Sequence, residues 1–152
     1  MKVAALAGIL AAAILAAVAY SYRRIYNKPY FDEFLLASIE SGVPVKRVIA
    51  IATQESGIQM VDGQAGEKGI MQLTSPAVID AERHTGKTFP GWQTDPRQNI
   101  RAGVGYLSYL FKVEFPRDLD TATRAYNAGP TGAREGGGYS YLAAVKSVQS
   151  TF

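Results

Sequence analysis

Residues 44–57 read PVKRVIAIATQESG, an amphipathic pattern that ends on a glutamate, Glu55. The proline suits the first turn of a helix, and the apolar residues after it recur at helical spacing. Gly57 favours a C-terminal stop, so the helix is expected to run from Pro44 to about Glu55. The stretch therefore predicts a helix that holds one acidic side chain at its C-terminal end.

The position of Glu55 makes it the candidate catalytic residue. A carboxylate in the last turn of a helix faces the negative end of the helix dipole, which disfavours its charged form. Partial burial acts in the same direction, and both effects raise the pKa of the carboxyl group. A raised pKa suits a general acid at neutral pH. An isolated glutamate at a helix end is more often a solvent-exposed charge, so the pattern alone leaves both interpretations open.

The rest of the chain predicts a mainly α-helical domain around one irregular segment. Glycines interrupt residues 58–73, which favours a loop or a poorly formed hairpin there. Asp95 is a good N-cap, and Gly129-Pro130 is expected to end a short helix that begins near Leu119. Ile39 is placed on the buried face of its helix. Helical patterns cover residues 31–41, 76–83, 96–111 and 119–126, and a last stretch after Gly138.

An uncharged apolar run, residues 3–20, precedes the predicted domain. Eighteen helical residues span about 27 Å, slightly less than a typical hydrocarbon core of about 30 Å. Arg23 and Arg24 follow the run as the flank of a retained anchor would. We therefore expect one N-terminal transmembrane helix within residues 1–24 that contacts the lipid bilayer through residues 3–22. The alternative is a signal peptide, cleaved near Ala17-Val18-Ala19.

Composition narrows the classes of function. The 152 residues suit one domain, expected at 31–152 after a linker at 25–30. The chain has no cysteine and one histidine, which argues against disulfides, thiolate chemistry and His-rich metal sites. No cofactor or metal is expected. Outside Lys2, Arg23 and Arg24, 13 of the 16 basic residues balance 13 acidic ones. This near-neutral domain does not suit nucleic acid, which requires a basic surface.

Three motifs follow one another along the chain: Glu55-Ser56, then GIMQL at 69–73, then AYNAGP at 125–130. Asp95-Pro96, Asn99-Ile100 and Tyr106-Leu107 stand between the last two. In this order the chain resembles the lytic transglycosylases of the soluble-transglycosylase and goose-type-lysozyme superfamily, over about residues 31–149. The resemblance implies a lysozyme-like α-helical fold and peptidoglycan glycan strands as the substrate.

The resemblance also implies a mechanism with one acid. Glu55 would protonate the oxygen between N-acetylmuramic acid and N-acetylglucosamine, and the transition state would resemble an oxocarbenium ion. As a base, Glu55 would then help the 6-hydroxyl attack C1 and leave a 1,6-anhydro sugar. Gln64 stands near the place where many relatives carry a serine that contacts the N-acetyl group. The expected substrate contacts are Ser56, Gln64, Gln72, Tyr126 and Asn127.

Several of these side chains have a structural alternative. Gln72 suits loop ordering as well as sugar binding, because amides do both. Ser56 suits a local hydrogen bond at its helix end. Trp92 suits a buried wedge at least as well as a sugar platform. His84 is assigned to the surface, and Glu67 to a solvated loop.

Two further functions compete with the transglycosylase. One is a hydrolytic muramidase of the same fold, and the other is a non-catalytic wall-binding or virion structural module. The domain is expected to be anchored to a membrane and to act on the periplasmic cell wall, as part of a larger envelope-spanning or virion assembly. Basic residues that flank a membrane helix favour the cytoplasmic side, so Arg23 and Arg24 weakly place the domain that follows them in the cytoplasm. This conflicts with action on the periplasmic wall. The internal membrane of a phage virion, or secretion after signal cleavage, would remove the conflict.

Overall fold

A computed structural model describes residues 13, 16 and 23–152. That part is mainly helical, as the sequence predicts. The expected membrane segment, residues 3–22, lies almost entirely outside it, and no helix of the described part is long and apolar enough to cross a bilayer. The elements are α2 (Phe31–Ser41), α3 (Val45–Ser56), α4 (Ser75–Thr85), α5 (Pro96–Tyr109), the π-helical turn η1 (Leu110–Glu114), α6 (Leu119–Arg134) and α7 (Tyr139–Gln149).

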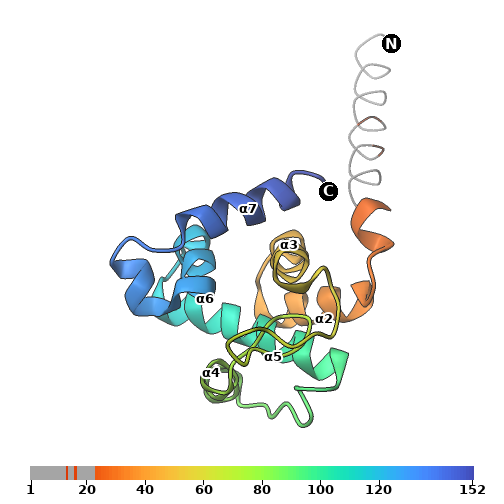
Figure 1. The fold of residues 1–152 in the computed structure, drawn as a ribbon. Coiled ribbons are helices and arrows are strands. Elements are labelled where there is room, and N and C mark those ends of the chain that lie inside the picture. Colours follow the sequence, from red (N-terminus) through yellow and green to blue (C-terminus); the bar gives the residue numbers. More distant parts are fainter. Residues whose placement is uncertain (1–12, 14–15, 17–22) are drawn as a thin grey trace.

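Helix α3 lies at the centre of the domain. Residues 47–52 are buried on every side of the helix, because α2 and α7 both pack against it. Figure 1 shows α3 viewed nearly end-on, with α7 on one side of it and α2 and α5 on the other. Such a helix is held in a fixed orientation by its neighbours, so the side chains at its C-terminal end are also fixed.

Local signals determine where the helices begin and end. Gly57 adopts φ 65° and closes α3 at Ser56, which leaves Glu55 in the last turn as expected. Asp95 caps α5 by accepting hydrogen bonds from the backbone N–H groups of Arg97 and Gln98. These two boundaries confirm the sequence interpretation.

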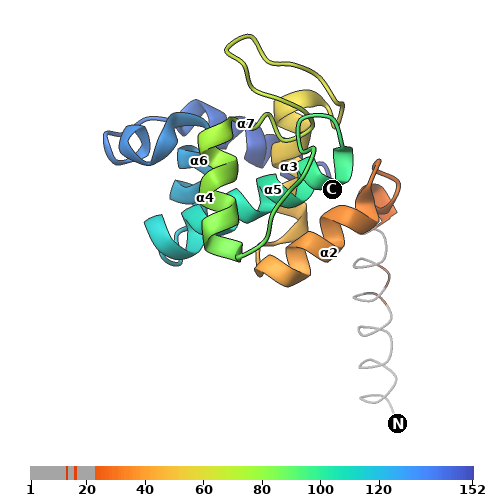
Figure 2. The same ribbon diagram turned by 90° about the horizontal axis from the view of Figure 1, so that it is seen from below.

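The irregular segment between α3 and α4 forms only two isolated antiparallel bridges in the described structure, Asp62 with Lys68 and Lys68 with Leu73. Asn99 on α5 organises it. This fully buried amide donates to the carbonyls of Lys68 and Trp92, both at 3.0 Å, and accepts from the N–H of Met71 at 2.8 Å. Figure 2 shows the segment leading into α4, which lies across α5.

Gly69 permits the close approach of this segment to α5. Its φ is 78°, and a Cβ there would lie 2.3 Å from the Asn99 amide nitrogen. Trp92, whose carbonyl Asn99 also binds, is 9% exposed and belongs to the core. Trp92 therefore packs as a wedge.

As expected, the helical path that begins at Leu119 breaks at Gly129 (φ 73°, ψ 162°), and Pro130 then starts a further turn to Arg134 that the sequence did not predict. The expectations for Ile39 and His84 were wrong. Ile39 is 70% exposed, because α2 turns that side of its last turns to solvent. His84 is not a free surface residue but is half-buried, with its Nε2 3.1 Å from the Ser108 hydroxyl. The expected linker, residues 25–30, contributes the fully buried Ile25.

Candidate active site

Glu55 is partly buried at the end of α3 and is held there by α7. The hydroxyl of Tyr141, 86 residues further along the chain, donates a hydrogen bond to its Oε1. Burial raises the pKa of the Glu55 carboxyl, while the Tyr141 hydrogen bond opposes the rise and the negative charge of Glu67 adds to it. The net direction is upward, which keeps the acid form available at higher pH than for an ordinary glutamate.

Tyr141 itself stays protonated. Burial and the neighbouring Glu55 charge raise the pKa of its phenol far above the usual range. It therefore acts as a permanent hydrogen-bond donor to the carboxylate, which is the form of Glu55 that accepts most strongly. The pair is arranged to stabilise negative charge on Glu55 after a proton has left.

A cleft of about 260 Å³ opens beside Glu55. It lies where the end of α3, the irregular segment, the start of α4 and the kink of α6 meet. Polar groups on its walls come from α3, the irregular segment, α5 and α6, and they include hydroxyl, amide and carboxyl groups. Its walls include Glu55, Glu67, Gln72, Tyr106, Tyr126 and Asn127.

Tyr126 ties α6 to the GIMQL stretch. Its hydroxyl donates to the carbonyl of Met71 at 2.9 Å, and its ring lies against that of Tyr106 with centroids 5.5 Å apart. Burial raises the pKa of both phenols, that of Tyr106 to about 12. Both rings are therefore neutral walls of the cleft at physiological pH. Asn127, the next residue on α6, is exposed at the cleft edge.

Gln72 orders the irregular segment, which is one of the two roles that the sequence left open for its amide. Its backbone has φ 46°, and its Nε2 donates to the carbonyls of Val61 at 2.9 Å and Gly69 at 2.7 Å. These bonds order the irregular segment. The same side chain lines the cleft, and its Oε1 lies where a Cβ on Gly63 would approach to 2.5 Å.

Two of the expected substrate contacts are not among the residues that line the cleft. Ser56 donates to the carbonyl of Ile70 at 2.8 Å and accepts from the N–H of Gln59 at 3.1 Å, so its hydroxyl joins α3 to the irregular segment. Gln64 is exposed in that segment. The structure brings together Glu55, Gln72, Tyr126 and Asn127.

Sequence reasoning missed Glu67, which it treated as a solvated loop charge. Glu67 is half-buried, accepts a hydrogen bond from the N–H of Ala65 at 3.1 Å and lines the cleft. The two antiparallel bridges fold the loop back on itself and bring this carboxylate toward Glu55. Glycine spacing revealed a turn but not which side chains it directs inward.

Arg124 is a second residue that sequence reasoning missed. It is 7% exposed and donates to the carbonyls of Gly137 at 2.8 Å and Ala133 at 2.7 Å. Its guanidinium also lies 3.8 Å from the ring centroid of Tyr139, at the first residue of α7. Arg124 thus holds the glycine-rich connection whose end determines where Tyr141 lies.

Comparison with known families agrees with this geometry. Residues 34–147 match the family model of the transglycosylase SLT domain. The chain belongs to the SLT family. The soluble lytic murein transglycosylase of Escherichia coli K12 is 32% identical over 105 residues, which cover 66% of this chain and 16% of the relative. The membrane-bound lytic murein transglycosylase F of Alcanivorax borkumensis is 36% identical over 109 residues, which cover 66% and 21%.

Solved structures place the SLT domain in the same lysozyme-like fold. An inactive glutamate-to-glutamine mutant of lytic transglycosylase Slt from Pseudomonas aeruginosa matches with a TM-score of 0.62 and 27% identity, over 68% of this chain and 17% of that one. The 70 kDa soluble lytic transglycosylase of Escherichia coli matches with a TM-score of 0.62 and 28% identity, over 78% and 19%. The SLT domain thus corresponds to a small part of these longer proteins.

Proposed function

We propose that this SLT domain is a lytic transglycosylase that cleaves the β-1,4 bond between N-acetylmuramic acid and N-acetylglucosamine in peptidoglycan. The observation that carries the proposal is the Glu55 carboxyl: partly buried, raised in pKa, hydrogen-bonded to Tyr141 and facing a polar cleft. A glycosidic oxygen needs a proton as it leaves, and such a carboxyl can donate one near neutral pH. The names of the curated relatives support the same activity.

The proposed reaction uses Glu55 twice. Its proton goes to the glycosidic oxygen as the bond to C1 breaks, through an oxocarbenium-like transition state. The resulting carboxylate, stabilised by the Tyr141 hydroxyl, then accepts the proton of the sugar's own 6-hydroxyl as that oxygen bonds to C1. The product is a 1,6-anhydro sugar, and Glu55 returns to its acid form. Gln72, Tyr126 and Asn127 are proposed to contact the sugar because they line the same cleft.

Substitution of the acid tests this proposal. Glu55→Gln keeps the shape of the side chain and removes the transferable proton, so turnover of purified peptidoglycan should be abolished. Glu135→Gln is the matched control, since it makes the same change in charge at an exposed residue outside the cleft. Activity retained by Glu55→Gln would refute the assignment. The Pseudomonas aeruginosa relative described as an inactive mutant carries the same type of substitution.

The position of Glu67 favours a second candidate, a hydrolytic muramidase. Glu67 lies in the same cleft as Glu55, and a second carboxylate can activate a water molecule to attack C1. Mass analysis of the digest separates the two reactions, because the anhydro product is lighter than the reducing-end sugar by one water. If the reducing-end sugar dominates and is lost in Glu67→Gln, the muramidase replaces the transglycosylase.

We also infer from the sequence that residues 3–22 anchor the domain to a membrane. The apolar run and its arginine flank support this, and one curated relative is named as membrane-bound. The domain would then act on the periplasmic wall, or be packaged on the inner face of a virion membrane until entry. Added protease digests the domain in intact vesicles or particles only if it faces outward, which distinguishes the two locations.

A further inference from the structure

A larger cavity, of about 420 Å³, lies on another side of the domain. It is enclosed by the last turns of α2 and α4, the loop after α4, and α5. It shares no lining residue with the cleft at Glu55. The proposed cleavage reaction therefore makes no use of it. Its size falls within the range of small-molecule sites in proteins, about 300–1,000 Å³.

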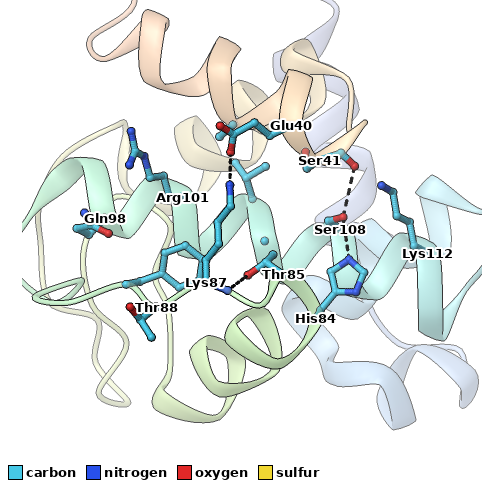
Figure 3. A pocket seen from close by; sticks show the side chains of 14 residues that line it. Glu40, Ser41, His84, Thr85, Lys87, Thr88, Gln98, Arg101, Ser108 and Lys112 are labelled. Atoms are coloured by element: carbon cyan, nitrogen blue, oxygen red, sulfur yellow. Dashed lines mark hydrogen bonds and ion pairs between the residues drawn. The ribbon is translucent and has the colours of Figure 1, made fainter.

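The walls of this cavity carry both signs of charge. Lys87, Arg101 and Lys112 are its cations, and Glu40 is the carboxylate among its described lining residues. Lys112 forms none of the ion pairs found among the described residues, whereas Arg101 is held by the buried Glu33. Figure 3 shows Lys112 beside Ser108 at one end, Arg101 at the other, and the Glu40–Lys87 pair between them.

The polar groups at the Lys112 end are already oriented. Ser108 is 2% exposed, and its hydroxyl lies 3.1 Å from Nε2 of His84 and 3.4 Å from the carbonyl of Ser41. Burial, and then the charge of Lys112, lower the pKa of His84, so this imidazole is neutral near neutral pH. The Ser108 hydroxyl donates its proton to the carbonyl of Ser41, so the group at this end that can bind a carboxylate is the Lys112 ammonium, beside a neutral ring.

The Glu40–Lys87 ion pair is suited to exchanging partners. The two groups lie 2.6 Å apart, but their side chains are 49% and 55% exposed. Exposed pairs of this kind contribute little to stability, so a ligand group can replace either partner at small cost. A ligand ammonium on Glu40 would leave Lys87 in solvent.

The distribution of charge also argues against a compact anion such as phosphate. Helix α4 ends at Thr85 beside the cavity, and the last carbonyls of a helix carry partial negative charge. Glu40 adds a full negative charge. A ligand with separated positive and negative groups satisfies both ends, and the apolar floor, which includes Ala37 and Val104, suits a short aliphatic part between them.

We propose that this cavity binds a short peptide with free termini, its ammonium on Glu40 and its carboxylate on Lys112. The cavity volume of about 420 Å³ lies in the range of small-molecule sites, so the ligand is limited to a peptide of a few residues. The site lies beyond the cleavage reaction and does not depend on Glu55.

Titration of the isotope-labelled full chain with alanyl-alanine, followed by backbone amide NMR, tests the proposal. Saturable shifts are expected in residues 84–89 and 101–112. Glu40→Gln and Lys112→Gln should each weaken binding about tenfold, the effect of losing one charge-assisted hydrogen bond. Arg83→Gln is the matched control, because it removes an exposed cation of α4 that does not line the cavity. Glu55→Gln should bind as the parent does, which separates this test from that of catalysis.

Two blocked peptides test the assignment of each end. Alanyl-alanine amide keeps only the ammonium, so its binding should depend on Glu40 and not on Lys112. N-acetyl-alanyl-alanine keeps only the carboxylate and should show the reverse. The N-acetyl form also represents a peptide whose amino end is bonded to a sugar, and weaker binding of it than of the free peptide favours a free ligand. Absence of saturable shifts, equal shifts with inorganic phosphate, or an equal loss in Arg83→Gln would overturn the proposal.

Discussion

Removal of one hydroxyl, in Tyr141→Phe, tests the proposed link between α7 and catalysis. The Tyr141 hydroxyl is the side-chain donor that binds the Glu55 carboxylate. Glu55 must gain negative charge as it gives up its proton, so this hydrogen bond is stronger in the transition state than in the ground state. A hydrogen bond to a charged group contributes about 1.5–3 kcal/mol. Because Glu55 is partly exposed, the lower end applies, about 1.5 kcal/mol, and kcat should fall roughly tenfold.

The pH profile separates this effect from a general loss of structure. The Tyr141 hydrogen bond lowers the pKa of Glu55, so its removal lets burial raise that pKa further. The acid form then persists to higher pH, and the alkaline limb of kcat/KM should move upward while the maximum falls. Initial rates on soluble glycan strands across pH 5–9 measure both quantities.

Tyr139→Phe provides the matched control for this measurement. Tyr139 begins the same helix but is 63% exposed and stacks on Arg124. Tyr139→Phe removes only the hydroxyl and keeps the ring, so both the rate maximum and the alkaline limb of kcat/KM should stay unchanged. The reasoning would be refuted if Tyr141→Phe kept the wild-type rate, or if its alkaline limb stayed in place or moved downward.

Three further outcomes are expected. Glu67→Gln removes a negative neighbour that raises the pKa of Glu55, so the alkaline limb of kcat/KM should move to lower pH; an upward move would contradict the assigned sign. Glu55→Gln should raise the melting temperature near pH 7, by about 3 °C if the gain is about 1 kcal/mol. The pKa of Glu55 is higher in the folded protein than in the unfolded chain, so the wild-type protein loses stability as pH rises from the unfolded pKa to the folded pKa. The advantage of the variant should therefore vanish below about pH 4.3, the usual pKa of a glutamate. Gly103→Ala would bring a methyl group to 2.6 Å from Cβ of Met71 and should cost about 1–3 kcal/mol in urea unfolding, whereas Gly105→Ala, with its nearest atoms at 3.3 Å, should cost less.

The helical elements were predictable because their signals are local. The apolar spacing of residues 45–52 and the glycine at 57 identify α3 from a dozen adjacent residues, and Asp95 identifies the start of α5 from its own first turn. Gly129 shows how far such signals reach. The glycine ends the helical path that begins at Leu119 as expected, but the motif gives no sign of the further turn from Pro130 to Arg134.

The composition of the cleft was only partly predictable. Gln72 and Tyr126 were found because they belong to recognisable motifs, but the bonds they make, to Val61 and Met71, depend on how the irregular segment folds. Gln64 lies close to Glu55 in sequence yet outside the cleft. The irregular segment contains residues with left-handed backbone and two isolated bridges, so the number of residues that separate a side chain from Glu55 does not indicate whether it points into the cleft.

The sequence by itself determined that one glutamate would stand at the end of an amphipathic helix, because helix period, proline and glycine act over a few neighbouring residues. Only the tertiary structure decided what surrounds that glutamate. Tyr141 reaches it from 86 residues away because α7 packs on α3, and Glu67 reaches it because the loop folds back on itself. Burial and neighbouring charges set the pKa of Glu55, and both are properties of packed segments rather than of any single stretch of sequence.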